Sequence, residues 1–146
     1  MAVTITSMTD EQRKSVALEY LKRLDRGQDF FELFADDVQI YFPKWGIANG
    51  LDEAKQLFAD VGSILGSITH DYAYFNYIHA GDMVVVEGTS SGTTATGVEW
   101  RAGVTHAGRW CDVFEIRDHK IQRVFIYLDP DYGDGDLARY PWLARA

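Results

Sequence analysis

The stretch that decides the fold is DVFEIRDHKI, residues 112–121. It joins a strand predicted over 106–117 to a last long strand predicted over 120–129, because apolar side chains recur at a period of two in both. Asp118 and His119 stand between the two periodic segments and predict a tight hairpin turn. His119 is expected to take a positive φ there, which histidine tolerates better than bulkier residues do.

Further strands are predicted on the N-terminal side of this hairpin. Residues 68–79 form an aromatic strand with a period of two, Gly81 and Asp82 mark a tight turn, and residues 83–94 form the next strand. Residues 93–104 are rich in threonine and glycine and predict a loop or a bulged region.

Helices come before these strands. Thr9 and Gln12 have the spacing of a capping box, and Gly27 is a plausible stop, so a first helix is predicted between them. A short second helix is predicted over residues 29–34, where phenylalanine and leucine side chains crowd one side.

A short strand over 38–42 ends at Pro43, and a loop over 44–50 leads to a third helix. One face of that helix is apolar and contains Ala54, Leu57, Phe58, Val61 and Leu65. Helices followed by an antiparallel meander make an α+β pattern.

Composition excludes several classes of function. The 146 residues predict one domain, 1–146, and the net charge of −8 disfavours nucleic acid and anionic membrane surfaces as partners. No apolar run is long enough to span a membrane. The single cysteine, Cys111, rules out an internal disulfide, and the four scattered histidines lack metal-ligand spacing, so no metal is expected. The chain carries no signal-peptide pattern, and a cytoplasmic location is predicted.

The order of elements resembles the cone-shaped fold shared by nuclear transport factor 2 (NTF2), ketosteroid isomerase, scytalone dehydratase and the SnoaL-like polyketide cyclases. The motifs that carry the resemblance are residues 33–38, Asn49-Gly50, residues 112–121 and residues 127–129. The resemblance covers nearly the whole chain. It implies a curved antiparallel sheet wrapped around the N-terminal helices, an apolar pocket, no cofactor, and a homodimer through the open sheet face.

Asp112 is the most informative candidate for a catalytic residue. It shares a predicted strand face with Trp110, Phe114 and Ile116, and a carboxyl in such a row is desolvated, which raises its pKa and suits proton transfer. The alternative is that this face is the outer one and Asp112 is solvated. The resemblance implies an acid–base role, because SnoaL-like cyclases place an aspartate near this position.

His70 and Asp25 are the other two catalytic candidates. His70 opens the predicted strand 68–79, and the resemblance implies a catalytic histidine there, as in scytalone dehydratase and a related dehydrochlorinase. Asp25 ends the first helix, where the resemblance implies an aspartate that orients the histidine. The alternatives are a hydrogen-bonded core histidine and a solvated helix-end charge beside Arg23 and Arg26.

Aromatic residues are the candidates for binding a substrate. Tyrosine hydroxyls can donate hydrogen bonds to a carbonyl or enolate oxygen, and the sequence does not choose among the candidates. The candidates are Tyr20, Tyr41, Tyr74, Trp110, Phe114 and Tyr127. Filling of an ordinary core is the alternative for each of them. In the tail, Tyr140 and Trp142 are candidates for closing the pocket or packing on a partner subunit.

Two functions fit these observations. The first is a cofactor-free acid–base enzyme for a small hydrophobic oxygenated molecule such as a polyketide, terpenoid or steroid-like compound. Its reaction would be an isomerisation, a dehydration or an aldol-type cyclisation. The second is a non-catalytic module of the same fold that binds a hydrophobic ligand or serves assembly. Asp112 and His70 within hydrogen-bond reach at a pocket wall, directly or through one water, would favour the enzyme. Side chains that point apart or to solvent would favour the binding module.

Overall fold

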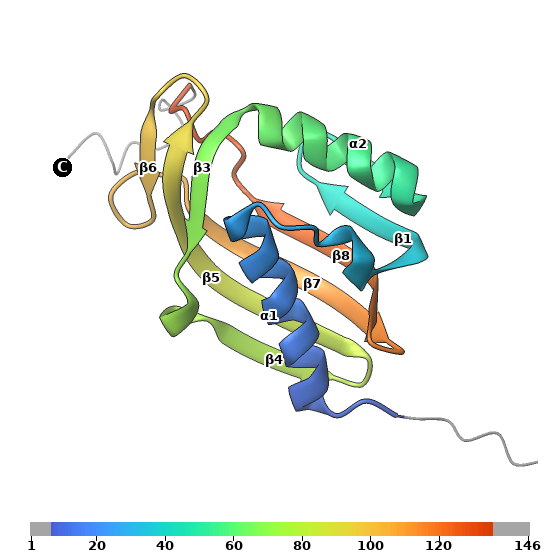
Figure 1. The fold of residues 1–146 in the computed structure, drawn as a ribbon. Helices are drawn as coiled ribbons and strands as arrows, with labels where there is room; N and C mark the ends of the chain where they lie inside the picture. Colours follow the sequence, from blue (N-terminus) through green and yellow to red (C-terminus); the bar gives the residue numbers. More distant parts are fainter. Residues whose placement is uncertain (1–6, 136–146) are drawn as a thin grey trace, which may run out of the picture.

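The computed structural model describes residues 7–135 and shows a curved, open sheet of eight strands with two α-helices on its concave side (Figure 1). The helices are α1 (Asp10–Arg26) and α2 (Gly50–Ser63), with short 3-10 turns η1 (Phe31–Leu33) and η2 (Tyr72–Tyr74). The strands are β1 (Phe34–Phe42), β2 (Gly46–Asn49), β3 (Leu65–His70), β4 (Asn76–Ala80), β5 (Met83–Thr94), β6 (Glu99–Arg101), β7 (Arg109–Arg117) and β8 (Lys120–Leu128). The predicted α+β cone is confirmed.

Local signals at both ends fix α1. The Thr9 hydroxyl accepts from the Gln12 backbone N–H and the Gln12 side chain accepts from the Thr9 backbone N–H, so the predicted capping box is present. Gly27 ends the helix in the left-handed conformation at φ 66°. Tyr20 and Leu21 lie on the buried face, so α1 presents its last two turns to the concave side of the sheet.

The sheet is mixed, which corrects the expectation of an antiparallel sheet. Its order is β2-β1-β8-β7-β5-β3, and β4 and β6 also pair with β5. β1 runs parallel to β8, and the other pairs are antiparallel. Hairpin turns join only antiparallel neighbours, so a meander cannot give this parallel pair. After β1 the chain forms the other strands before β8 returns to lie beside β1.

The predicted strand 68–79 is two strands, and this correction moves His70. One half of β5 pairs with β4 and the other half with β3. The segment 65–80 is therefore interrupted at η2, between these two strands. The Asp71 N–H donates to the Thr89 carbonyl and the Tyr74 N–H donates to the Asp71 carbonyl, which closes the turn. His70 therefore ends β3 instead of opening a long strand.

Other boundaries differ where tertiary pairing overrides local pattern. The helix predicted over 29–34 shrinks to η1, because Phe34 already pairs with β8. The predicted loops 44–50 and 93–104 contain β2 and β6, which pair with longer neighbours. The third helix ends at Ser63, so Leu65 belongs to β3. The strand predicted from residue 106 begins at Arg109.

The predicted hairpin between β7 and β8 forms. Asp118 and His119 have φ angles of 52° and 59°, which is the geometry of a type I′ turn. Burial alternates along β7, with Trp110, Asp112 and Phe114 facing the helices, so the predicted inner face is confirmed. None of the described helices is long and apolar enough to cross a membrane.

Candidate functional site

A cavity of about 360 Å³ lies between α1, α2 and the concave face of the sheet. A cavity of about 150 Å³ holds one benzene ring, so this one has room for a ligand of roughly two rings. Its wall is mainly aliphatic and aromatic, with Leu21, Phe58 and Ile126 among the lining residues. The polar side chains come from α1, β3, β5, β7 and the segment after β8, and none of the lining residues within 7–135 is a lysine or an arginine. The cavity therefore favours a ligand without negative charge.

Asp112 places a carboxyl in this apolar wall. Its side chain is 3% exposed, and no described residue forms a hydrogen bond or an ion pair with it. Burial penalises the charged form and raises the pKa of Asp112 from an ordinary 3.8 to about 8. The group is therefore mostly protonated at pH 7, and it can donate a hydrogen bond or a proton to a ligand oxygen.

Asp25 and His70 form a second polar group at the same cavity, and Tyr72, which does not line the cavity, contacts Asp25. Asp25 Oδ1 lies 2.6 Å from His70 Nδ1, and Asp25 Oδ2 accepts from the His70 backbone N–H at 2.9 Å. The Tyr72 hydroxyl donates to Asp25 Oδ2 at 2.5 Å. These contacts hold the end of α1 against the end of β3, which explains why a carboxylate stands at a helix C-terminus despite the helix dipole.

The environment of Asp25 keeps it ionised. Burial acts to raise its pKa, but the hydrogen bonds from His70 and Tyr72 and the attraction of the imidazole outweigh burial, and the pKa lies below its ordinary value. A carboxylate at Nδ1 favours the tautomer with its proton on Nδ1, which leaves the Nε2 lone pair for the cavity. The Trp110 ring packs edge-on against the imidazole at 5.1 Å and restricts its rotation.

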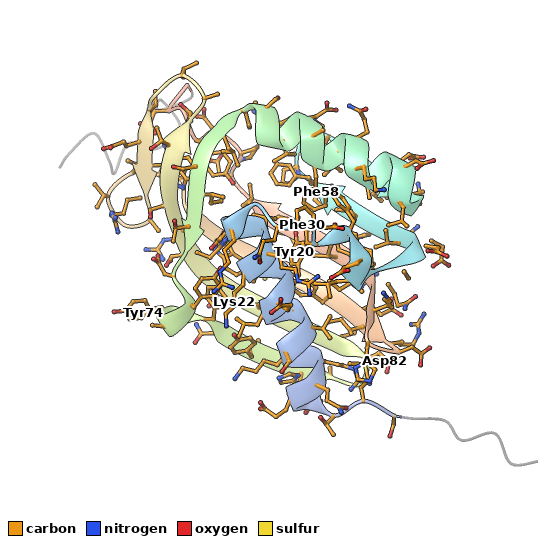
Figure 2. All side chains as sticks on the ribbon, viewed as in Figure 1. Tyr20, Lys22, Phe30, Phe58, Tyr74 and Asp82 are labelled. Atoms are coloured by element: carbon orange, nitrogen blue, oxygen red, sulfur yellow. The ribbon has the colours of Figure 1, made fainter. Side chains whose placement is uncertain are left out.

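Tyr20 lies between the two polar groups. It is 1% exposed, and burial and then the carboxyls of Asp112 and Asp25 raise the pKa of its phenol well above the ordinary value. Figure 2 shows Tyr20 on α1 with Phe30 and Phe58 nearby, and the ring centroids are 5.6 and 6.4 Å from that of Tyr20. The phenol is a neutral hydrogen-bond donor at any pH at which the protein would work.

Five of the nine predicted site residues line the cavity: Asp112, His70, Asp25, Tyr20 and Trp110. No described hydrogen bond joins Asp112 to His70, so the two polar groups meet only through the space that they share.

The other four predicted residues lie elsewhere, which corrects their placement at the pocket. Phe114 is fully buried beneath the cavity, where it packs against Tyr20. Tyr41 and Tyr127 lie on the outer face of the sheet with ring centroids 5.5 Å apart, because the neighbours of Tyr41 in β1 take the inner positions. Tyr74 projects from η2 and is 76% exposed (Figure 2).

Two tyrosines of the site are not predicted from the sequence: Tyr72, which contacts Asp25, and Tyr132, which lines the cavity. The unbroken strand predicted over 68–79 does not place Tyr72 near Asp25, although its spacing of two from His70 is visible in the sequence. Tyr132 comes from a segment after β8 that has no periodicity. Tyr140 and Trp142 lie outside the described residues. Within residues 7–135, no group of three His, Cys, Asp or Glu side chains is arranged to hold a metal ion.

Comparison with known proteins defines the class. The family model for the SnoaL-like domain matches residues 17–124, so the chain belongs to the SnoaL-like family, in which ligand-binding and isomerase-type proteins share the NTF2-like fold. No curated protein sequence matches significantly.

Solved structures agree on the fold. The chain is similar to TerC, co-crystallised with polyporic acid, at 19% identity and a TM-score of 0.68, covering 92% of this chain and 99% of that one. It is also similar to an NTF2-like protein of unknown function from Burkholderia pseudomallei, at 17% identity and a TM-score of 0.67, covering 95% and 100%. A de novo designed protein with a curved β-sheet matches at 18% identity and a TM-score of 0.61, covering 92% and 98%. At these identities the likeness carries the fold alone.

Proposed function

We propose that this protein is a cofactor-free acid–base enzyme acting on a small, uncharged, hydrophobic molecule that carries a carbonyl or hydroxyl oxygen. The observation that carries the proposal is the Asp112 carboxyl, buried without a partner in an apolar cavity. Native proteins seldom bury a polar group unpaired, because its desolvation is not offset. A ligand oxygen in the cavity supplies the missing partner.

The two polar groups of the cavity suit opposite halves of a proton transfer. His70 Nε2 takes a proton from the carbon next to a carbonyl, the C–H electron pair forms a C=C double bond, and the π pair of the carbonyl moves onto its oxygen. Asp112, neutral at pH 7, donates its proton or a hydrogen bond to that oxygen as negative charge develops there. The Asp25 carboxylate stabilises the imidazolium that forms. Isomerisation, dehydration and aldol-type cyclisation all use this enolisation step.

The cavity also limits the substrate. Carboxylates and phosphates would meet the Asp25 carboxylate, and within residues 7–135 the wall has no lysine or arginine to balance their charge. A neutral molecule of roughly two rings fits the volume of about 360 Å³. Binding of polyporic acid by TerC, which has the same fold, supports small-molecule binding in this chain too.

The rival function is a non-catalytic ligand-binding module of the same fold. It is favoured by the apolar character of most of the wall and by the lack of a described hydrogen bond between Asp112 and His70. Both functions predict ligand binding, and only the enzyme predicts proton transfer.

Deuterium exchange separates the two. In D2O, the enzyme should speed incorporation of deuterium next to the carbonyl of 1-tetralone or 2-tetralone, two neutral two-ring ketones, as measured by mass spectrometry. Asp112→Asn and His70→Gln should each lower the rate by at least about 100-fold, and Asp25→Asn by about 10-fold or more. Asp52→Asn, in the exposed first turn of α2, is the matched control and should match the wild type. Binding of the ketones without exchange would favour the passive module.

The outer face of the sheet supports a homodimer. Paired residues on six strands give one apolar row across it: Ile78, Val85, Val113, Phe125, Tyr41 and Ile47. Ile78 and Ile47 are more than half exposed. A second copy of the chain would cover this row with its own, which removes apolar area from water on both copies.

A further inference from the structure

The segment that follows β8 closes one end of the cavity. Tyr132 is 4% exposed and lines the cavity, and its ring packs on Trp100 of β6 with centroids 4.5 Å apart. Trp100, Ala107 and Tyr132 form a small core of their own, separate from the main core. The position of Tyr132 therefore depends on β6 and on the loop after it, and not on the main sheet alone.

Close contacts between His106 and two carboxyl groups hold this segment in place. The ring of His106 is 1% exposed, with Nε2 3.3 Å from Asp131 Oδ2 and Nδ1 2.8 Å from Asp134 Oδ1. Asp131 also accepts from the Gly135 backbone N–H at 2.8 Å, and its own N–H donates to Asp129 at 2.9 Å. Tyr132 is thus carried by a turn that is held on both sides of it.

The hydroxyl of Tyr132 is left for a ligand. No described residue forms a hydrogen bond with it, although the residue is almost fully buried at the cavity wall. Burial raises the pKa of the phenol above its ordinary value, and the Asp112 carboxyl adds to the rise, so the two groups face the same space. The protonated Asp112 carboxyl and the Tyr132 hydroxyl are both buried donors at this cavity. One ligand oxygen has two lone pairs and could accept a hydrogen bond from each of them.

We propose that Tyr132 is a ligand-binding residue of the cavity, and that its hydroxyl donates a hydrogen bond to the same carbonyl oxygen that Asp112 contacts. The inference rests on the proposed function for the presence of that ligand. It adds a specificity: with two donors at one oxygen, the site selects ketones over hydrocarbons of the same shape. An analogue without the oxygen leaves both donors unpaired.

The first test needs no ligand. In protein labelled with ¹³C at the tyrosine Cζ, the Tyr132 signal should shift with a midpoint near pH 8 as Asp112 ionises, and Asp112→Asn should remove the step. The signal of Tyr74, which is 76% exposed on η2, is the internal control and should show no such step. Absence of the step from Tyr132 overturns the inference. Because this test uses the wild-type chain, it holds even if a Tyr132 variant folds poorly.

The second test uses a matched pair of probes, 1-tetralone and tetralin, which differ in one carbonyl oxygen. Tyr132→Phe should weaken 1-tetralone about three- to tenfold in a fluorescence titration and leave tetralin within about twofold. Tyr74→Phe is the control and should change neither. Equal effects on both probes, or none, overturn the inference alone. Failure of both probes to bind the wild type overturns the proposed function and this inference with it.

Discussion

Asp112 is the residue at which the cavity departs from an ordinary core. Its neighbours on the inner face of β7 are Trp110 and Phe114, and a carboxyl between them is stable only when protonated. The protein avoids most of the cost of burying a charge by keeping the group neutral near pH 7, but the cost returns as the pH rises. The same property that makes Asp112 a proton donor makes it a source of pH-dependent instability.

Stability should therefore fall with pH because of this one residue. Between the unfolded pKa of about 3.8 and the folded pKa of about 8, the folded state holds the proton and the unfolded state has lost it, so the free energy of unfolding decreases as pH rises. The slope from one such group is at most about 1.4 kcal/mol per pH unit. Asp112→Asn should flatten it, as measured by urea unfolding at pH 5, 6, 7 and 8. An unchanged slope would contradict the assignment of this titration to Asp112.

Single residues of the site were predictable to different degrees. The period of two in β7 was enough to predict that Asp112 lies on the inner face of the sheet. The pairing of Asp25 with His70 came from resemblance, and nothing in local pattern joins residues 45 positions apart. The spacing of two between His70 and Tyr72 is visible in the sequence, but the 3-10 turn that brings Tyr72 to Asp25 is not, and Tyr132 lies in an irregular segment without periodicity.

At the scale of elements, β5 organises the site. Its 12 residues pair with β7 and then β6 along one edge, and with β4 and then β3 along the other, so it must bend where its partners change. Two glycines of β5, Gly88 and Gly92, let neighbouring rings and backbone pack directly against this bend. A Cβ on Gly88 would lie 2.6 Å from the Trp110 ring, and one on Gly92 would lie 2.2 Å from the Ser67 carbonyl and 2.4 Å from the Trp100 ring.

Gly92→Ala should consequently destabilise the fold by about 2 kcal/mol or more, because the new methyl meets backbone as well as a ring. Gly62→Ala is the matched control in α2, where a Cβ meets nothing within 4 Å. It should stabilise the protein by about 0.5–1 kcal/mol through helix propensity. Thermal and urea unfolding of the two variants measure the difference, and equal stability of the two would contradict this account of β5.

Helices and turns whose own residues specify them were predicted well. Strands that form only because a neighbouring strand offers a partner were predicted poorly. The capping box and the positive-φ turn at Asp118 and His119 are local and formed as predicted. β2 and β6 are short edge strands that exist because β1 and β5 offer them partners. The break before η2 was hidden because aromatic residues continue through it.

At the scale of the whole molecule, the curved sheet separates two surfaces with different tasks. The concave face makes the cavity, and the convex face carries the apolar row centred on Val113. Val113→Lys should place a charge in the middle of the proposed dimer contact and shift the protein to monomer in sedimentation velocity at about 50 µM. Gln56→Lys, on the exposed side of α2, should leave the wild-type dimer intact. A wild type that is monomeric at this concentration would rule the contact out.

The parallel pairing of β1 with β8 also affects when the sheet can form during synthesis of the chain. β1 ends at Phe42, and its partner begins at Lys120, so on the ribosome the partner follows about 80 residues later, on the order of 4 to 16 s at typical rates of synthesis. Until then one edge of β1 has no strand to pair with, and the cavity lacks a wall. β8, the last strand within residues 7–135, completes the sheet, and a nascent chain stopped short of it presents an open edge to its neighbours on the polysome.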